Sequence, residues 1–217
     1  MSVLVQLLGT QAWVAEAAVD VAEPVRASEQ DAVEGAVPRR VAEFVTGRFC
    51  ARQALAAAGI PGVDLPARRS GGPRWPVGTV GSITHCEGYR AAAVARSDRW
   101  AAIGVDAEPA QALPDGVWEM ITSVSERRHV SALRRRCDLP LDRLVFSAKE
   151  SIYKAWSART QRWLDFTDAD LRLAAGGTFT ARLQRVDVRF PPSITGLWAC
   201  AARLLVTAVL IPAPSDR

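Results

Sequence analysis

The chain has 217 residues, a formal net charge of +4 and a hydrophobic fraction of 49%. This length and composition allow one large domain or two small ones around a buried core, and they exclude a disordered chain. The mild, dispersed charge and the lack of a motif that mixes basic and aromatic residues argue against a nucleic-acid-binding module.

Nothing near the start of the sequence predicts secretion or membrane insertion. Residues 1–8 are apolar, but they have no basic start and no cleavage site, and Glu16 and Asp20 follow soon after. No run of about 18 apolar residues exists, so no transmembrane helix is expected. The cysteines lack metal-ligand spacing and are expected to be buried free thiols: Cys50, Cys86, Cys137 and Cys200. We therefore expect a soluble protein of the cytoplasm.

The N-terminal part is expected to form two short strand segments and one long helix. Residues 3–8 and 12–19 are apolar runs of strand length. Residues 38–58 are predicted to be helical, because a proline stands at the start and the sequence Gly59-Ile60-Pro61 ends the pattern.

Three arginines share one side of this helix. Arg48 falls in the middle of its apolar arc, Arg52 lies within the arc, and Arg40 lies at the margin. An arginine on an apolar face either extends its charged end to solvent or meets an anion. The pattern leaves both interpretations open.

The middle of the chain is expected to contain a loop and then strands. Residues 61–81 are rich in Pro, Gly and Arg, which predicts a loop. Three strands are predicted at residues 79–86, 89–95 and 100–105. A linker at 109–116 is the best candidate for a domain boundary.

The C-terminal half is expected to form two helices and two strands. Ser123 and Glu126 have capping-box spacing, which predicts a helix that ends in the run Arg134-Arg135-Arg136. The strongest helix covers residues 141–158, and its apolar stripe is formed by Leu141, Leu144, Val145, Ala148, Ile152 and Trp156. Apolar strands are expected near residues 179–188 and 197–210.

Two carboxylates end the strand at residues 100–105. Asp106 and Glu108 are one residue apart, and the period of two in a strand places them on the same side. Such like charges repel each other unless a cation joins them. Mg²⁺ binds few protein oxygens and takes its other ligands from water and phosphates. A charged strand end that points into water is the alternative.

The helix at residues 141–158 carries the pair Glu150 and Lys154. With this spacing, the ordinary interpretation is a surface ion pair worth a few tenths of a kcal/mol. However, only two of the 27 basic residues are lysine, and both Lys149 and Lys154 lie on this helix. Lysine and arginine are not interchangeable at a site. Phosphoryl transfer needs a metal, cations and a carboxylate base, so the residues predict a magnesium-dependent enzyme that acts on a phosphate-bearing substrate.

Four motifs follow one another between Arg39 and Trp156. They are Trp75-Pro76, GSITHCEGYRA at 81–91, IGVDAEP at 103–109 and FSAKESIYKAW at 146–156. In this order and spacing they resemble the 4′-phosphopantetheinyl transferases of the surfactin-type class. Within that class they are most similar to the branch of the enterobactin synthetase transferase.

The resemblance implies an α+β fold in one monomeric chain, with two similar α/β lobes related by a pseudo-twofold axis. The active site is expected in the cleft between the lobes. Residues 1–108 would form the N-terminal lobe, with a site for the 3′-phosphate of coenzyme A and the carboxylates of the strand. Residues 109–217 would form the C-terminal lobe, with the 141–158 helix and a docking surface for a carrier protein.

The resemblance also implies a reaction. The 4′-phosphopantetheine group of coenzyme A would move to a serine of an apo-acyl or peptidyl carrier protein, which gives the holo-carrier and adenosine 3′,5′-bisphosphate. Asp106, Glu108 and Glu150 would bind Mg²⁺, or Mn²⁺, on the pyrophosphate. Glu150 would also be the base, directly or through a water. Lys154 would hold the pyrophosphate and support the leaving group. The carriers of fatty-acid, polyketide and nonribosomal peptide synthesis all remain open.

Coenzyme A contacts are expected from six side chains: Arg40, Arg48, Arg69, Thr84, His85 and Lys154. In this set, Arg40 and Arg48 match arginines that bind the 3′-phosphate. Ser70 stands where many relatives carry a basic residue, so Arg69 or Arg74 is expected to substitute for it.

The basic helix that starts at Ser123 has two interpretations. It is either a solvated face or a docking surface for carrier proteins, which are typically acidic. The rival to the enzyme as a whole is a coenzyme A-binding regulatory protein without transferase activity. Such a protein would lose a catalytic carboxylate, and all three are present here.

Overall fold

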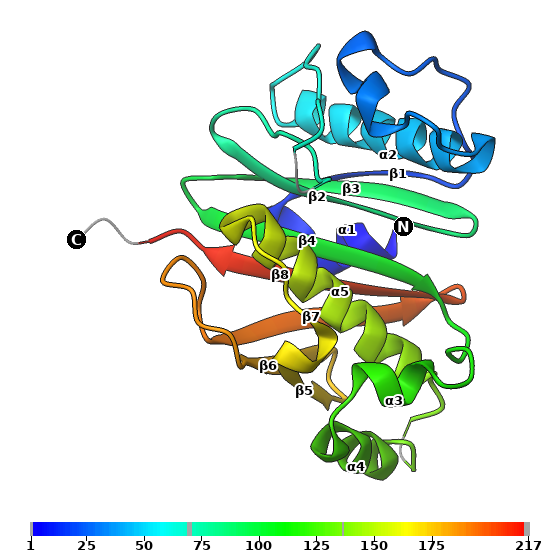
Figure 1. The fold of residues 1–217 in the computed structure, drawn as a ribbon, viewed down its shortest axis with the longest axis vertical. Coiled ribbons are helices and arrows are strands. Elements are labelled where there is room, and N and C mark those ends of the chain that lie inside the picture. The colour runs from blue at the N-terminus through cyan, green and yellow to red at the C-terminus, as the bar shows by residue number, and fades with distance from the viewer. Residues whose placement is uncertain (1, 69–70, 136, 215–217) are drawn as a thin grey trace.

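Two antiparallel sheets form the framework of the computed structural model, which describes residues 2–68, 71–135 and 137–214 (Figure 1). The first sheet has the strand order β1-β3-β2, with β1 at Trp13–Ala17, β2 at Thr79–Cys86 and β3 at Tyr89–Arg96. The second has the order β4-β8-β7-β6-β5, formed by β4 (Trp100–Pro109), β5 (Ala169–Ala174), β6 (Thr178–Leu183), β7 (Ser193–Ala201) and β8 (Leu204–Pro212).

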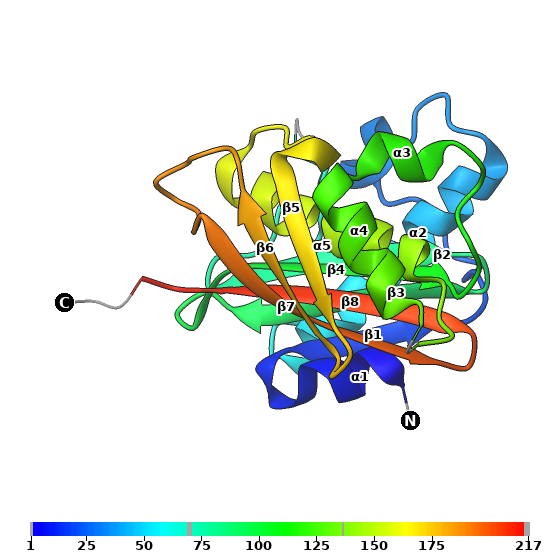
Figure 2. The same cartoon turned by 90° about the horizontal axis from the view of Figure 1, so that it is seen from below.

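Each sheet packs against one helix of 20 residues. The helix α2 (Pro38–Ala57) covers the three-stranded sheet, and α5 (Leu141–Thr160) lies across β4 and β8 of the other. Figure 2 shows the short helix α1 (Val3–Leu8) on the face of the five-stranded sheet opposite α5. Two further helices, α3 (Val117–Ile121) and α4 (Val124–Leu133), lie beside α5. The predicted α+β fold is confirmed.

The apolar stripe predicted on the 141–158 helix forms the centre of the larger core. All six of its side chains are at most 2% exposed, and they pack with the inner faces of β5, β6, β7 and β8. The predicted capping box is also present, since Ser123 accepts from the Glu126 amide and Glu126 accepts from the Ser123 amide.

The two sheets meet where β2 lies beside β4. Two side chains of β2 provide hydrogen bonds across this junction: Ser82 Oγ accepts from the Val105 amide and Thr84 Oγ1 from the Ala107 amide, both at 3.0 Å. On its other side β4 pairs with β8. Residues 100–108 therefore lie in the five-stranded sheet, and the predicted lobe boundary after residue 108 stays a prediction.

Gly104 allows α5 to approach β4 closely. A Cβ atom at this position would lie 1.9 Å from the carbonyl oxygen of Ser151 and 2.8 Å from the Ala155 nitrogen, both on the backbone of α5. Only glycine fits there, and the close approach brings the α5 side chains within reach of the carboxyl end of β4.

Some predicted elements were wrong or incomplete. Residues 3–8 form the helix α1 and not a strand, because Leu4 and Leu8 are one helical turn apart and both are fully buried. The strand β5 was missed. The strand expected at 179–188 ends at Leu183, and the one expected at 197–210 is two strands joined by a turn at Ala202 and Arg203.

The cysteines agree only in part with the prediction of buried free thiols. All four cysteines are free, but only Cys50 is buried, while the other three are partly exposed. Among the described residues, no helix combines the length and apolar character that a bilayer crossing requires.

Candidate active site

Asp106 is the most buried of the three predicted metal ligands, with 5% of its surface exposed. Its Oδ1 accepts hydrogen bonds from Lys154 Nζ at 2.7 Å and from Thr84 Oγ1 at 3.3 Å. Its Oδ2 is buried and has no hydrogen-bond partner among the described residues. A buried carboxylate oxygen without a partner is costly, so this atom is well placed to accept a cation.

Glu108 follows on the same side of β4 and is held by a cation of α5. Its Oε2 accepts from Arg143 Nη1 at 2.9 Å. Burial, helped by the charge of Asp106, raises the pKa of Glu108 to about 7, although Arg143 opposes the shift.

Glu150 extends from α5 toward the same region and is partly buried. Burial first, and then the charge of Asp106, raises the pKa of its carboxyl group. In the described part of the chain no hydrogen bond or ion pair reaches this carboxylate. The surface ion pair with Lys154 that the spacing allowed is absent from the described contacts, because the Lys154 ammonium lies against Asp106 and the Val105 carbonyl.

The three carboxylates present only oxygen atoms to a metal ion. In the described ranges, no group of three or more His, Cys, Asp or Glu side chains lies close enough together to hold a metal ion by itself. The free acceptor on Asp106, and the charge of Asp106 that raises the pKa of both glutamates, nevertheless fit a hard cation with oxygen ligands. Mg²⁺ needs few protein ligands and takes the rest from water and phosphate, so the residues fit this ion.

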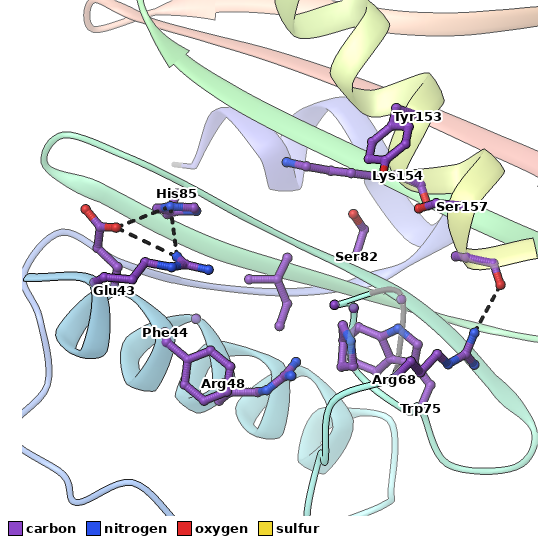
Figure 3. Close-up of a pocket in the computed structure, with 18 residues that line it drawn as sticks. Glu43, Phe44, Arg48, Arg68, Trp75, Ser82, His85, Tyr153, Lys154 and Ser157 are labelled. Atoms are coloured by element: carbon purple, nitrogen blue, oxygen red, sulfur yellow. Dashed lines mark hydrogen bonds and ion pairs between the residues drawn. The ribbon is translucent and has the colours of Figure 1, made fainter. Parts of the chain in front are cut away.

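A cavity of about 230 Å³ lies between α2, the loop before β2, β2 itself and the C-terminal half of α5 (Figure 3), and Lys154, which bonds to Asp106, is part of its wall. Its wall is basic and partly aromatic, with side chains that include Arg40, Phe44, Arg48, Arg68, Trp75, His85, Tyr153 and Lys154. Figure 3 shows Arg48 reaching into this space from α2 and Tyr153 and Lys154 lying on the opposite side.

Arg48 lines the cavity as a buried cation, and no described residue gives it a carboxylate partner. It is 2% exposed, its Nε has no hydrogen-bond partner among the described residues, and its guanidinium lies 4.7 Å from the centre of the Phe44 ring. Burial lowers the pKa of Arg48 to about 10, so the group stays charged at neutral pH. Of the two interpretations of this arginine, the structure favours anion binding, because the side chain does not reach solvent.

Two further predicted residues, Arg40 and His85, lie at the edge of the cavity. Arg40 Nη1 is 3.2 Å from His85 Nε2, and both side chains lie near Glu43. Burial, together with the charge of Arg40, lowers the pKa of His85. At neutral pH the imidazole is therefore a neutral group beside an arginine.

Other predicted residues lie elsewhere. Arg52 is buried but pairs with Glu29 at 3.1 Å, away from the cavity. Thr84 is 1% exposed and contacts Asp106, so it does not line the cavity, and a contact with phosphate stays a prediction. Arg69 lies outside the described residues.

The structure adds Arg68 to the cations of the cavity and explains the position of Lys149. Arg68 lines the cavity and donates to the Ala158 carbonyl at 3.0 Å, whereas Arg74 is exposed and does not line it. Lys149 is buried away from the cavity, where its ammonium pairs with Glu126 at 2.8 Å and donates to the Ile121 and Phe166 carbonyls. Of the two lysines, only Lys154 lines the cavity beside the carboxylates.

Comparison with known proteins identifies the family. Residues 28–95 match the model of the 4′-phosphopantetheinyl transferase N-terminal domain, and residues 102–201 match the model of the 4′-phosphopantetheinyl transferase superfamily. The 4′-phosphopantetheinyl transferase Svp of Streptomyces mobaraensis is 50% identical over 84% of this chain and 77% of its own. The transferase Npt of Nocardia iowensis is 40% identical over 84% and 87%, respectively.

The enterobactin branch is a more distant match. Enterobactin synthase component D of Salmonella typhi is 36% identical over 59% of this chain and 53% of its own. The resemblance drawn from the four motifs is confirmed by these similarities, and the chain belongs to the 4′-phosphopantetheinyl transferase superfamily.

Proposed function

We propose that this protein transfers the 4′-phosphopantetheine group of coenzyme A to a serine of an apo-carrier protein. The products are the holo-carrier and adenosine 3′,5′-bisphosphate. The observation that carries the proposal is Lys154, which bonds to the buried Asp106 and lines a cavity that also holds Arg48, a buried arginine with no carboxylate partner among the described residues. Membership of the family supports the same reaction.

In this reaction the serine oxygen attacks the phosphorus that carries the pantetheine arm. The new P–O bond forms as the bond from that phosphorus to the bridging pyrophosphate oxygen breaks, and the electron pair leaves with adenosine 3′,5′-bisphosphate. Glu150 accepts the serine proton, directly or through a water. Its raised pKa and its lack of a bound partner in the described residues suit a general base.

Asp106, Glu108 and Glu150 would hold Mg²⁺, or Mn²⁺, when it binds. The ion would supply positive charge to the pyrophosphate oxygens. Lys154 places a second cation beside Asp106 and at the edge of the cavity, where it supports the charge that develops on the leaving group.

Arg40 and Arg48 bind the 3′-phosphate of the donor, and His85 contacts the donor's phosphates. Arg48 supports this role most directly, since its buried charge lacks a carboxylate in the described structure. Arg68 takes the place of the basic residue that is missing at Ser70, because it lines the same cavity.

The carrier protein docks on and around α4. Arg128, Arg134 and Arg135 are exposed there, and Met120 and Val124 nearby are 75% and 56% exposed. A basic surface with exposed apolar side chains suits transient contact with an acidic carrier protein. The protein acts as a monomer in the cytoplasm.

The deciding experiment is to incubate the protein with coenzyme A, Mg²⁺ and several apo-carriers and to measure the intact carrier mass. We expect the mass of one phosphopantetheine group to be added. A folded protein that binds coenzyme A but modifies none of the fatty-acid, polyketide and peptide-synthetase carriers would instead be the regulatory protein of the alternative interpretation.

A further inference from the structure

The guanidinium of Arg143 makes three hydrogen bonds at and just after the carboxyl end of β4. Its Nη1 donates to Glu108 Oε2 at 2.9 Å, its Nε to the Gln111 carbonyl at 3.1 Å and its Nη2 to the Ala112 carbonyl at 2.9 Å. All three nitrogens of one guanidinium are therefore bound to the short segment from Glu108 to Ala112. The planar guanidinium group holds such partners in a fixed geometry.

The position of Arg143 on α5 relates it to the rest of the site. It lies seven residues before Glu150 and eleven before Lys154, which places the three side chains on one face of the helix. Lys154 contacts Asp106, and Arg143 contacts Glu108. The helix thus provides one cation for each carboxylate of β4 and leaves Glu150 uncompensated between them.

The ion pair between Arg143 and Glu108 is not an ordinary surface contact. The two side chains are 17% and 16% exposed, respectively. Exposed pairs contribute little, because their side chains must be ordered and solvent screens them. Here the Gln111 and Ala112 carbonyls already hold the Arg143 guanidinium in place. Glu108 therefore pairs with a cation whose orientation is fixed.

We propose that Arg143 is a positioning residue that orients Glu108 for metal binding. It occupies Oε2 of Glu108, and Oε1 has no hydrogen-bond partner in the described ranges. Arg143 acts through Glu108 and does not line the cavity for coenzyme A. The inference rests on the proposed function, because it assumes that the carboxylates bind a divalent cation.

The test measures metal binding without turnover. Mn²⁺ is titrated into the protein with coenzyme A but without a carrier, and free Mn²⁺ is followed by electron paramagnetic resonance. Arg143→Met is expected to weaken Mn²⁺ binding by about tenfold or more, as is typical when a group that orients a metal ligand is removed. Arg143→Lys restores the charge without the planar group, so a smaller loss is expected.

The matched control is Arg159→Met on the same helix, whose side chain makes one hydrogen bond among the described residues, to the Arg189 carbonyl. It should bind Mn²⁺ as the unsubstituted protein does, and thermal unfolding establishes that each variant is folded. Unchanged Mn²⁺ affinity in a folded Arg143 variant would overturn the positioning role alone. No Mn²⁺ binding by the unsubstituted protein would overturn the metal site and this inference with it.

Discussion

Two arginines one turn apart on α2 have opposite electrostatic surroundings. Arg48 lines the cavity and has no carboxylate partner among the described residues, while Arg52 pairs with the buried Glu29. A charge held without a partner stabilises the fold little and is available to a ligand. The buried pair of Arg52 and Glu29 matters for stability instead, because the loss of one partner leaves the other charge buried and unpaired.

Substitution of these two arginines should separate binding from stability. Arg48→Met is expected to raise the KM for coenzyme A by about tenfold or more, because bonds from a charged group to phosphate are strong. It should change the free energy of unfolding by less than about 1 kcal/mol. Arg52→Met should lower the free energy of unfolding by about 3–5 kcal/mol. Glu29 is 2% exposed, and among the described residues its carboxylate would keep only the hydrogen bond from the Leu65 amide. Its KM for coenzyme A should not change.

Steady-state kinetics and urea unfolding provide these two measurements. An Arg48→Met variant with an unaltered KM would show that this arginine does not contact the donor.

Glu150 provides the second prediction at this scale. Glu150→Gln should slow transfer by about 100-fold or more, because the amide cannot accept the serine proton. The fold should be retained, since no described group bonds to the carboxylate. Carrier mass measured over time gives the rate, and the melting temperature gives the stability.

Glu87→Gln, at an exposed position between β2 and β3, is the control for this substitution and should leave the rate and the melting temperature unchanged. Activity close to that of the control in Glu150→Gln would exclude Glu150 as the base.

At the scale of elements, the close packing of α5 on β4 depends on Gly104. Gly104→Ala should lower the free energy of unfolding by about 2 kcal/mol or more, because the new methyl group would meet the backbone of α5 and not a flexible side chain. Transfer should also fall, since the shift separates Glu150 from Asp106.

The control for this substitution is Gly176→Ala in the turn between β5 and β6. A Cβ atom there meets nothing within 4 Å, so urea unfolding should be nearly unchanged. Equal stability of the Gly104 variant and the unsubstituted protein would contradict the packing argument.

The long elements could be predicted from the sequence because their patterns are local. The apolar stripe of α5 repeats over about four turns, and the capping box before α4 needs only two residues. Residues 3–8 could not be assigned, because a short apolar run fits a strand and a buried helix equally well. The strand β5 did carry a signal, since apolar and charged residues alternate over positions 169–173.

The site was predictable to the extent that its residues lie in local motifs. Asp106 and Glu108 follow from strand period, whereas Glu150 needed the family resemblance. Arg143 was missed because its partner Glu108 is 35 residues away in the sequence and meets it only in the folded chain. Arg68 was missed because it lies in a loop whose path no periodic pattern specifies.

At the scale of the whole molecule, the surface around α4 carries the proposed docking function. Arg128→Glu should raise the KM for an acidic carrier about threefold or more at low salt, and the effect should shrink at high salt because the exposed charge is screened. The KM for coenzyme A should stay constant. Arg99→Glu, in the exposed turn between β3 and β4, makes the same charge change as a control. Equal effects of the two variants would place the docking surface elsewhere.

The junction between β2 and β4 consists of hydroxyl groups where a continuous sheet would have backbone pairs. The amides of Val105 and Ala107 donate to Ser82 and Thr84, while the alternate amides of β4 point toward β8. Amide hydrogen exchange at these two positions therefore reports how often the two halves separate. The cavity has walls from both halves, so coenzyme A should slow exchange at Val105 and Ala107 more than at the amides that face β8.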